Sequence, residues 1–288
     1  MIDSTRTADG TSGDRAGETA RREADLYQRL SAYESIMVAY SGGVDSAYLA
    51  WAANRARPGQ VLAVTADSPS YPRRHREMAE AVARQFQLPH EFVHTSELDR
   101  PEYRANASDR CYHCKTELFE HLSRMAAERG FTVVVDGNNA DDRGDHRPGR
   151  QAAREFGVES PLDAAGLTKA DIRTLAREAG LPVWDEPASA CLSSRIPYQS
   201  EVTSAKLATI ERAEELMRTL GFRVFRVRHH DAIARLEIAR DEMARALEAD
   251  TSAALVAGLK AIGYKYVSLD LQGYRTGSLN EVLPLKPI

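Results

Sequence analysis

A short apolar run that leads straight into a glycine-rich loop is the feature that most constrains the fold of this chain. Residues 36–40 are continuously apolar, which is typical of a strand buried on both faces of a parallel sheet. The hexapeptide SGGVDS, residues 41–46, comes next, and residues 47–56 continue as an apolar helix. A strand, a glycine loop and a helix in this order predict the first unit of an α/β fold.

The alternation of strands and helices continues along the chain. We expect further strands at 61–66, 90–94 and 131–136, and helices at 74–86 and 115–129. This alternation predicts an α/β class with a doubly wound parallel sheet. Ligands bind beyond the carboxyl ends of the strands in such sheets. The glycine loop, Asp67 and Gly137 all follow strands, so we expect them to meet at one edge of the sheet.

The pattern changes near residue 200. A long helix at 203–220 precedes strands at 223–229 and 232–239, helices at 241–249 and 252–262, and a strand at 264–271. This mixed order predicts a smaller α+β domain at the C-terminal end. Residues 1–20 are polar and lack the apolar core of a signal peptide, so we expect a disordered leader.

Composition limits the classes of partner. The 288 residues are 43% hydrophobic and 28% charged, which is ordinary for a globular protein with a buried core. The formal net charge of -4 argues against nucleic acid as a partner. No stretch of about 18 apolar residues occurs, so we expect no membrane span and a cytoplasmic location. Only three cysteines occur, which argues against a disulfide framework.

The glycine loop has the properties of a phosphate-binding loop. Glycines let the backbone approach phosphate oxygens closely, and the amide groups at the start of the next helix face the anion. Ser41 and Ser46 add hydroxyl donors. Asp45 is unexpected beside an anion unless it holds Mg²⁺, which takes carboxylate and phosphate oxygens. The loop lacks the Gly-Lys-Ser/Thr ending of a Walker A sequence.

The three cysteines form a second candidate site. Cys111 and Cys114 make a C-x-x-C pair that we expect on a loop, and Cys191 lies in the segment ACLSSR, residues 190–195. Three thiols without an obvious fourth ligand suit a [4Fe-4S] cluster with one open iron. A structural zinc site, a dithiol redox pair and ordinary buried cysteines are the alternatives.

The hexapeptide resembles the pyrophosphate loop (PP-loop) of the adenine nucleotide alpha-hydrolase superfamily, which cleaves ATP between the α- and β-phosphates. The wider pattern is similar to the LarE family of ATP-dependent sulfur transferases, which helps to build the nickel-pincer cofactor of lactate racemase. The matching segments are 40–46, 110–115, 136–142, 147–149, 160–162, 187–198 and 270–280. Together they cover about residues 24–285, and ACLSSRIPY at 190–198 is the most specific.

The resemblance implies a defined reaction. ATP would adenylate a carboxylate of a pyridinium biscarboxylic acid mononucleotide, and sulfur would displace AMP to leave a thiocarboxylate. Some family members sacrifice the sulfur of the cysteine equivalent to Cys191, whereas others use three cysteines and a [4Fe-4S] cluster. Because this chain has all three cysteines, the cluster-dependent type is favoured.

The resemblance also assigns domains and sites. It makes 21–199 a PP-loop ATP-binding domain of HUP-like fold and 200–288 a domain for substrate binding and oligomerisation. Cys111, Cys114 and Cys191 would be catalytic residues and cluster ligands, and Asp45 the Mg²⁺ ligand. The expected ATP-binding residues are Ala39, Ser41, Gly42, Gly43, Asp45, Ser46, Thr65 and Gly137.

Basic residues are candidates for an anionic substrate. Arg195, Arg228 and Arg275 are the expected substrate ligands. Arg226 and Arg228 alternate on a predicted strand, so both side chains face one side. Arg147, which precedes Pro148, is a further candidate for a phosphate, since guanidinium binds it with a bidentate fork.

Three other functions remain open. A tRNA thiolation enzyme would also combine a PP-loop with three cysteines, but it predicts a basic RNA-binding surface. An ammonia-using amide synthetase leaves the cysteines unexplained. A nucleotide-binding regulator would bind ATP without forming AMP. As members of the family assemble as homo-oligomers, we expect the same of this chain.

Overall fold

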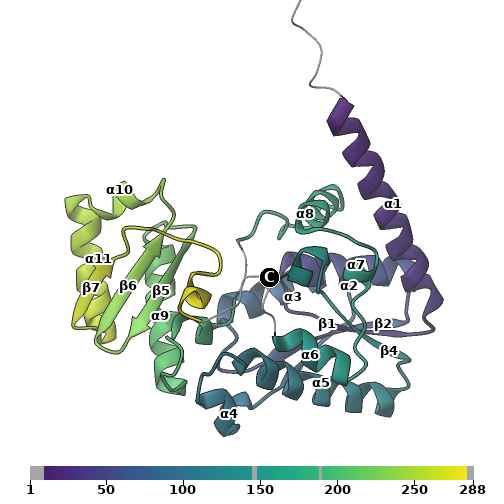
Figure 1. The fold of residues 1–288 in the computed structure, drawn as a ribbon, viewed down its shortest axis with the longest axis horizontal. Coiled ribbons are helices and arrows are strands. Elements are labelled where there is room, and N and C mark those ends of the chain that lie inside the picture. Colours follow the sequence, from purple (N-terminus) through teal and green to yellow (C-terminus); the bar gives the residue numbers. More distant parts are fainter. Residues whose placement is uncertain (1–9, 145–147, 188–189, 284–288) are drawn as a thin grey trace, which may run out of the picture. The chain divides into compact units, whose positions relative to one another are not determined.

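The computed structural model describes residues 10–144, 148–187 and 190–283. Within these ranges the chain divides into two compact units. The first comprises residues up to 66, 75–93 and 115–186, and the second comprises 67–74, 94–114 and the residues from 187 onward. Figure 1 shows the course of the chain through both units.

A four-stranded sheet forms the centre of the first unit. Its strands are β1 (Ile36–Ala39), β2 (Val61–Asp67), β3 (His90–His94) and β4 (Val133–Asp136), in the order β3-β2-β1-β4. β1 pairs in parallel with β2 on one side and with β4 on the other. All four residues of β1 are buried, as its apolar sequence predicts for a central strand.

Helices cover both faces of this sheet, and Figure 1 shows α2 and α7 on one side and α5 and α6 on the other. The helices whose residues lie wholly or mainly in this unit are α1 (Gly10–Ala32), α2 (Val44–Ala56), α3 (Arg73–Gln85), α5 (Arg110–Arg129), α6 (Pro148–Glu155), α7 (Pro161–Ala164), α8 (Lys169–Glu178) and the 3₁₀ turn η2 (Ala140–Gly144). The predicted α/β class with a parallel sheet is confirmed.

The second unit is built on a three-stranded sheet. β5 (Phe225–His230) pairs antiparallel with β6 (Ile233–Ile238), which pairs in parallel with β7 (Tyr266–Leu269). Helices α9 (Ser204–Thr219) and α11 (Ala249–Ile262) pack against each other and against this sheet around an apolar core. The remaining elements are α4 (Pro101–Arg104), α10 (Met243–Ala246), η1 (Glu97–Asp99), η3 (Leu192–Arg195) and η4 (Ser278–Val282). This unit is the smaller α+β body expected from the sequence.

Two boundaries differ from the sequence-based expectation. α1 begins at Gly10, so half of the segment expected to be a disordered leader is helical. Asp171 of α8 accepts hydrogen bonds from Thr19 and Arg22 of α1, which explains why the helix extends beyond its apolar stripe. The second unit begins near residue 187 rather than 200 and takes in two segments from the first half of the chain.

A capping box begins α8. Thr168 accepts a hydrogen bond from the backbone of Asp171, and the Asp171 side chain accepts one from the backbone of Thr168. This reciprocal capping box fixes the first turn of α8. In the described part of the chain, none of the helices is long and apolar enough to cross a membrane.

Candidate nucleotide and thiol sites

The glycine loop lies at the point where the strand order reverses. β1 lies between β2, the next strand in the sequence, and β4, which comes after β3 in the sequence and forms the opposite edge of the sheet. The loops after β1 and β4 therefore diverge at the same place, which is where open α/β sheets bind ligands. The loop after β1 is residues 41–46, and Gly137 follows β4.

Hydrogen bonds within the loop hold it in a compact turn. The Ser46 hydroxyl accepts a hydrogen bond from the Ser41 amide at 3.1 Å and donates one to the Gly43 carbonyl at 3.1 Å. Gly42 has φ of +70°, and a Cβ there would lie 2.9 Å from the Cβ of Ala79, so only glycine fits. Gly43 is the N-cap of α2 and brings no side chain over the first-turn amides. These amides therefore remain available to an anion.

Gly137 makes a second close approach to the loop. A Cβ added to Gly137 would lie 3.0 Å from the amide nitrogen of Ser46. The expected convergence of the loop and Gly137 is therefore present in the structure. Thr65 is 1% exposed, and its hydroxyl donates to the Tyr40 carbonyl at 2.6 Å, which ties β2 to the end of β1. Ala39 is the last residue of β1 and is buried.

Asp45 uses only one of its two carboxylate oxygens within the described residues. It is the second residue of α2, and its Oδ2 forms a hydrogen-bonded ion pair with the Lys169 ammonium. Its Oδ1 is buried and has no hydrogen-bond partner among the described residues. Burial raises the pKa of Asp45, Asp142 acts in the same direction, and Lys169 lowers it. A carboxylate with one unused oxygen beside a phosphate loop fits Mg²⁺, which commonly binds one or two carboxylates together with substrate phosphates.

The C-x-x-C pair lies on a helix and not on the expected loop. α5 begins at Arg110, so Cys111 and Cys114 occupy its first turn. Residues three apart in a helix share a face, and amides at a helix start favour negative charge. The loop prediction was wrong because the polar sequence of this turn has no helical stripe of its own. None of the three cysteines forms a disulfide; Cys111 is exposed, and the other two are partly buried.

Two buried side chains connect the pair to Cys191. Tyr103 interacts electrostatically with Cys191 and Cys114, and Arg110 does so with Cys191 and Cys111. The Tyr103 hydroxyl lies 2.5 Å from the Ser193 hydroxyl, and Arg110 donates to the Ser193 carbonyl at 3.0 Å. Both contacts lead to the segment that carries Cys191. The two parts of the sequence that hold the cysteines therefore meet around one tyrosine and one arginine.

Asn106 fixes the start of this arrangement. It has a left-handed backbone with φ of 55° and accepts a hydrogen bond from Arg110 at 2.6 Å through Oδ1. Its side-chain amide donates to the carbonyls of Pro197 and Ser200 at 2.7 and 2.9 Å. Asn106 is fully buried, so these contacts lock the turn before α5 onto the segment after Cys191.

Arg195 holds the backbone around Cys191. Its Nη1 donates to the carbonyls of Ala190 and Cys191 at 2.9 and 3.0 Å. Its other nitrogens donate to both carboxylate oxygens of Glu214 at 2.8 and 3.0 Å. Burial would raise the pKa of Glu214, but the guanidinium outweighs burial and keeps it below its ordinary value. Because these contacts engage all three guanidinium nitrogens, the geometry favours positioning of Cys191 over substrate binding for Arg195.

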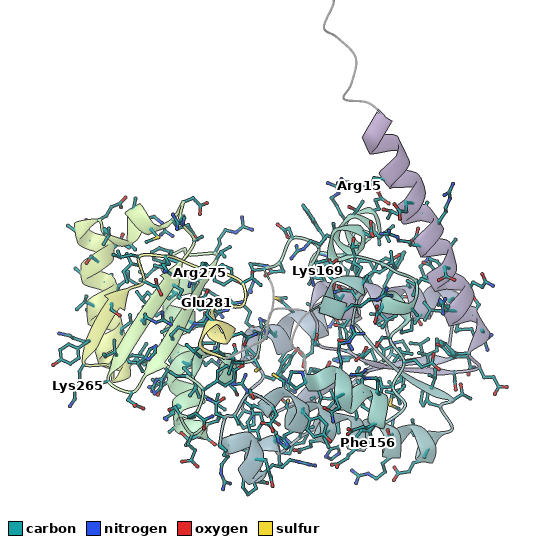
Figure 2. The ribbon with its side chains drawn as sticks, viewed as in Figure 1. Arg15, Phe156, Lys169, Lys265, Arg275 and Glu281 are labelled. Carbon is teal, nitrogen blue, oxygen red and sulfur yellow. The ribbon has the colours of Figure 1, made fainter. Side chains whose placement is uncertain are left out.

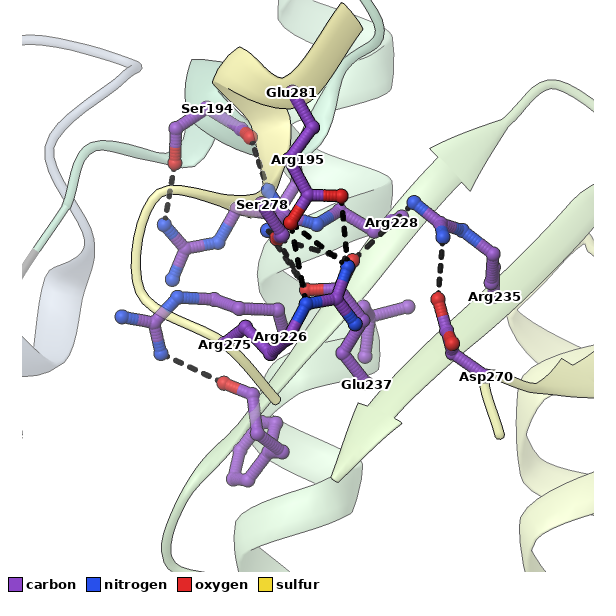
Figure 3. A network of polar contacts seen from close by, with 12 residues as sticks. Ser194, Arg195, Arg226, Arg228, Arg235, Glu237, Asp270, Arg275, Ser278 and Glu281 are labelled. Atoms are coloured by element: carbon purple, nitrogen blue, oxygen red, sulfur yellow. Dashed lines mark hydrogen bonds and ion pairs between the residues drawn. The ribbon is translucent and has the colours of Figure 1, made fainter. Parts of the chain in front are cut away.

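The other predicted substrate arginines belong to a polar network on β5, β6 and η4, shown in Figure 3. Arg228 donates to Glu237 at 2.7 Å, to Ser278 at 2.7 Å and to the Ser194 carbonyl at 2.6 Å. Arg275 and Glu281 form an ion pair, and Figure 2 labels both. Arg228 Nε and Arg275 Nη1 are buried without a partner in the described part of the chain.

A third arginine lies close to this network. Arg226 interacts electrostatically with both Arg195 and Arg228, and its guanidinium lies 5.0 Å from the centre of the Tyr274 ring. Burial, assisted by Arg195, lowers the pKa of Arg226 to about 10. Arg226 therefore adds a positive charge to a network in which Arg195, Arg228 and Arg275 each pair with a glutamate.

Sequence reasoning missed several residues of these sites. Lys169, Tyr103 and Glu214 make their contacts across long sequence separations, so no local pattern could identify them. A lysine at the first position of a helix was the one available signal, because the helix dipole disfavours a cation there. The predicted phosphate ligand Arg147 lies outside the described residues.

The described residues include no ready-made metal site. Among them, no group of three or more histidine, cysteine, aspartate or glutamate side chains is arranged to hold a metal ion. For iron, the fit rests on donor chemistry, because Cys191 interacts with both Tyr103 and Arg110, Cys114 with Tyr103 and Cys111 with Arg110. The thiols would need to converge before they could bind one cluster.

Comparison with known proteins identifies the family. Residues 26–144 match the family model of asparagine synthase. The chain is 41% identical over 259 residues to an uncharacterised protein of Synechocystis sp., covering 90% of this chain and 97% of the relative. It is 33% identical over 265 residues to the pyridinium-3,5-bisthiocarboxylic acid mononucleotide synthase of Lactiplantibacillus plantarum, covering 92% of this chain and 95% of the relative. The chain belongs to the LarE family.

Membership of the LarE family confirms the resemblance that the motifs carry. An uncharacterised protein of Methanocaldococcus jannaschii is also related, at 28% identity over 84% of this chain and 92% of the relative. The asparagine synthase match covers the strand, glycine loop and helix of the nucleotide site. This LarE-family chain is therefore an ATP-dependent enzyme.

Proposed function

We propose that the protein is an AMP-forming sulfur transferase that converts a carboxylate of a pyridinium biscarboxylic acid mononucleotide to a thiocarboxylate, in nickel-pincer cofactor biosynthesis. The observation that carries the proposal is the meeting of Cys111, Cys114 and Cys191 around Tyr103 and Arg110. An amide-forming synthetase has no use for such a thiol site. The relative from Lactiplantibacillus plantarum carries the corresponding product in its name.

The nucleotide site supports the first half of this reaction. A substrate carboxylate oxygen would attack the α-phosphorus of ATP, and pyrophosphate would leave. The amides at the start of α2 and the hydroxyls of Ser41 and Ser46 would hold pyrophosphate oxygens. Asp45 would hold Mg²⁺, which neutralises charge on the leaving group. The acyl adenylate is a good acyl donor, whereas a free carboxylate is a poor one.

The second unit supports binding of the substrate. A pyridinium mononucleotide with two carboxylates carries several negative charges. Arg228 and Arg275 each have one buried nitrogen without a partner among the described residues, and such donors gain most from an incoming anion. Arg226 adds a cation beside them. We assign phosphate and carboxylate recognition to this network.

The thiols support the second half of the reaction. A sulfur nucleophile would add to the acyl carbon, and AMP would leave. Cys111, Cys114 and Cys191 would hold a [4Fe-4S] cluster, which supplies a bound sulfide when present. Arg195 and Arg110 fix the backbone around Cys191 through the carbonyls of residues 190, 191 and 193. The protein is further proposed to act in the cytoplasm as a homo-oligomer, without a nucleic acid partner.

The test is an anaerobic measurement of iron, acid-labile sulfide and the visible spectrum. It compares the wild type with the single variants C111A, C114A and C191A. Y112F serves as a matched control because it changes the same helical turn and keeps all three thiols. We expect about four irons and four sulfides per chain in the wild type and in Y112F, and loss of iron in each cysteine variant.

The same proteins are then given Mg·ATP and pyridinium-3,5-biscarboxylic acid mononucleotide, and AMP and thiocarboxylate are measured. Both products are expected from the wild type, and no thiocarboxylate from C191A. Absence of iron after reconstitution would overturn the cluster and leave Cys191 as a sacrificial donor, detected as dehydroalanine. Amide formation by a protein without cysteines would instead favour the synthetase.

A further inference from the structure

Lys169 occupies a position that helix stability does not explain. It is the first residue of α8, directly after the N-cap Thr168. A cation at this end of a helix is unfavourable because the amide dipoles make the N-terminus positive. The Lys169 backbone is nevertheless anchored there, because its amide donates to Asp141 Oδ2 at 2.8 Å. Contacts of Lys169 outside α8 must therefore explain its position.

The side chain of Lys169 makes such a contact. Figure 2 labels it in the first unit, and its ammonium is hydrogen-bonded to Asp45 Oδ2 in the glycine loop. The two residues are 124 positions apart, and α2 and α8 pack against each other to bring them together. The lysine side chain is 34% exposed and the aspartate 21%. Lys169 therefore stays within reach of solvent and of an incoming ligand.

Lys169 and Arg173 act on Asp45 as positive charges, and Lys169 is hydrogen-bonded to it. Asp142 is buried nearby and acts on Asp45 as a second negative charge. Without a cation, two carboxylates would share a site that burial already makes unfavourable for charge. In the described residues Asp45 Oδ1 has no partner, so this oxygen is available to a metal ion.

We propose that Lys169 exchanges partners when the nucleotide binds. In the nucleotide-free protein its ammonium takes the place of the metal ion beside Asp45. When Mg·ATP enters, Mg²⁺ takes Asp45 together with phosphate oxygens, and the ammonium turns to a pyrophosphate oxygen of ATP. The flexible lysine stem suits this exchange, because an ammonium is a compact charge with no fixed fork. The proposal rests on the assignment of the loop to Mg·ATP.

The exchange predicts two effects of opposite sign for one substitution. The variant K169M keeps the length of the stem and removes the charge. It should bind Mn²⁺, used as a probe for Mg²⁺, roughly fivefold or more tightly without nucleotide, since the competing ammonium is gone. It should bind Mg·ATP about tenfold to a hundredfold more weakly, because a charge-assisted hydrogen bond to phosphate is lost.

The experiment measures Mn²⁺ binding from the electron paramagnetic resonance signal of the free ion, and Mg·ATP binding by calorimetry. K169R keeps the charge and should stay within about threefold of the wild type for Mn²⁺. K260M removes an exposed lysine of α11 and controls for net charge. Thermal melting of each variant establishes that it is folded.

The outcomes separate the proposals. Unchanged or weaker Mn²⁺ binding by folded K169M would overturn the exchange, even if ATP binding falls, because Lys169 would then be a phosphate ligand alone. Unchanged Mg·ATP binding by K169M would overturn it as well. Neither result touches the sulfur transfer proposal, which fails separately if the wild type forms no AMP with its substrate.

Discussion

The buried ion pair between Arg195 and Glu214 gives the sharpest test of how the Cys191 segment is held. The pair is bidentate, and the two side chains are 3% and 2% exposed. Substitution of Glu214 by glutamine keeps the shape of the side chain and leaves the guanidinium charge uncompensated in the interior. Breaking such a pair from one side costs about 3–5 kcal/mol, against a total stability of about 5–15 kcal/mol.

Urea unfolding of E214Q and E215Q measures this cost with a matched control. Glu215 is the next residue of α9, and its side chain is 52% exposed beside Arg218. The same substitution there should cost less than about 1 kcal/mol. For E214Q we expect a midpoint lower by roughly 1 M or more, since the slope for a protein is about 1–3 kcal/mol per M.

Hydrogen exchange then tests the connection to Cys191. In E214Q the guanidinium loses its anchor, so amides near residues 190–196 should exchange faster, whereas those of β1 should not. The double variant R195M/E214Q removes the uncompensated charge and should cost less than the sum of the two single changes. Equal urea midpoints for E214Q and E215Q would refute the reasoning, because the buried ion pair would then stabilise the protein no more than the surface ion pair does.

Two further predictions concern the first unit. G137A should weaken Mg·ATP binding by roughly tenfold or more, because its Cβ would lie 3.0 Å from the Ser46 amide and displace the loop; G17A, where a Cβ meets nothing within 4 Å, is the control in the same calorimetric titration. Burial would raise the pKa of Asp171, but hydrogen bonds from Thr19, Thr168 and Arg22 lower it to about 2. The folded pKa lies below the ordinary value of 3.8, so this stabilisation is present above pH 4 and is lost as the pH falls toward 2. Between pH 5 and pH 2 the free energy of unfolding of the wild type should therefore fall by roughly 1 kcal/mol more than that of D171N, after solvent screening. Melting temperatures of both proteins across this pH range measure the difference.

The fold could be predicted because its signals are local. The apolar run of β1 and the glycine loop each lie within a few consecutive residues. The second unit could not be delimited in this way. Its early segments join it through contacts such as Leu192 with Ser70 and Arg110 with Ser193, which span more than 80 residues. Periodicity carries no information about such contacts.

The candidate sites show the same division. The glycine loop was predictable because its own backbone requires a glycine, as at Gly42, where φ is +70°. The pairing of Arg195 with Glu214 was not, because a lone arginine near a cysteine is equally compatible with substrate binding and with a glutamate partner. The C-x-x-C pair was misplaced on a loop because the helical start at Arg110 is fixed by tertiary contacts of Asn106 and not by local sequence.

The contacts around Cys191 hold its backbone and leave its side chain outside any disulfide. Its carbonyl accepts hydrogen bonds from Arg195 and from the Ser194 hydroxyl, so the backbone is fixed. Its thiol is free and partly exposed, so the sulfur stays accessible. A structural cysteine would need neither a buried arginine at its carbonyl nor an exposed sulfur. Under the proposed function, a fixed backbone would hold the Cys191 thiol in one place as a cluster ligand through successive turnovers.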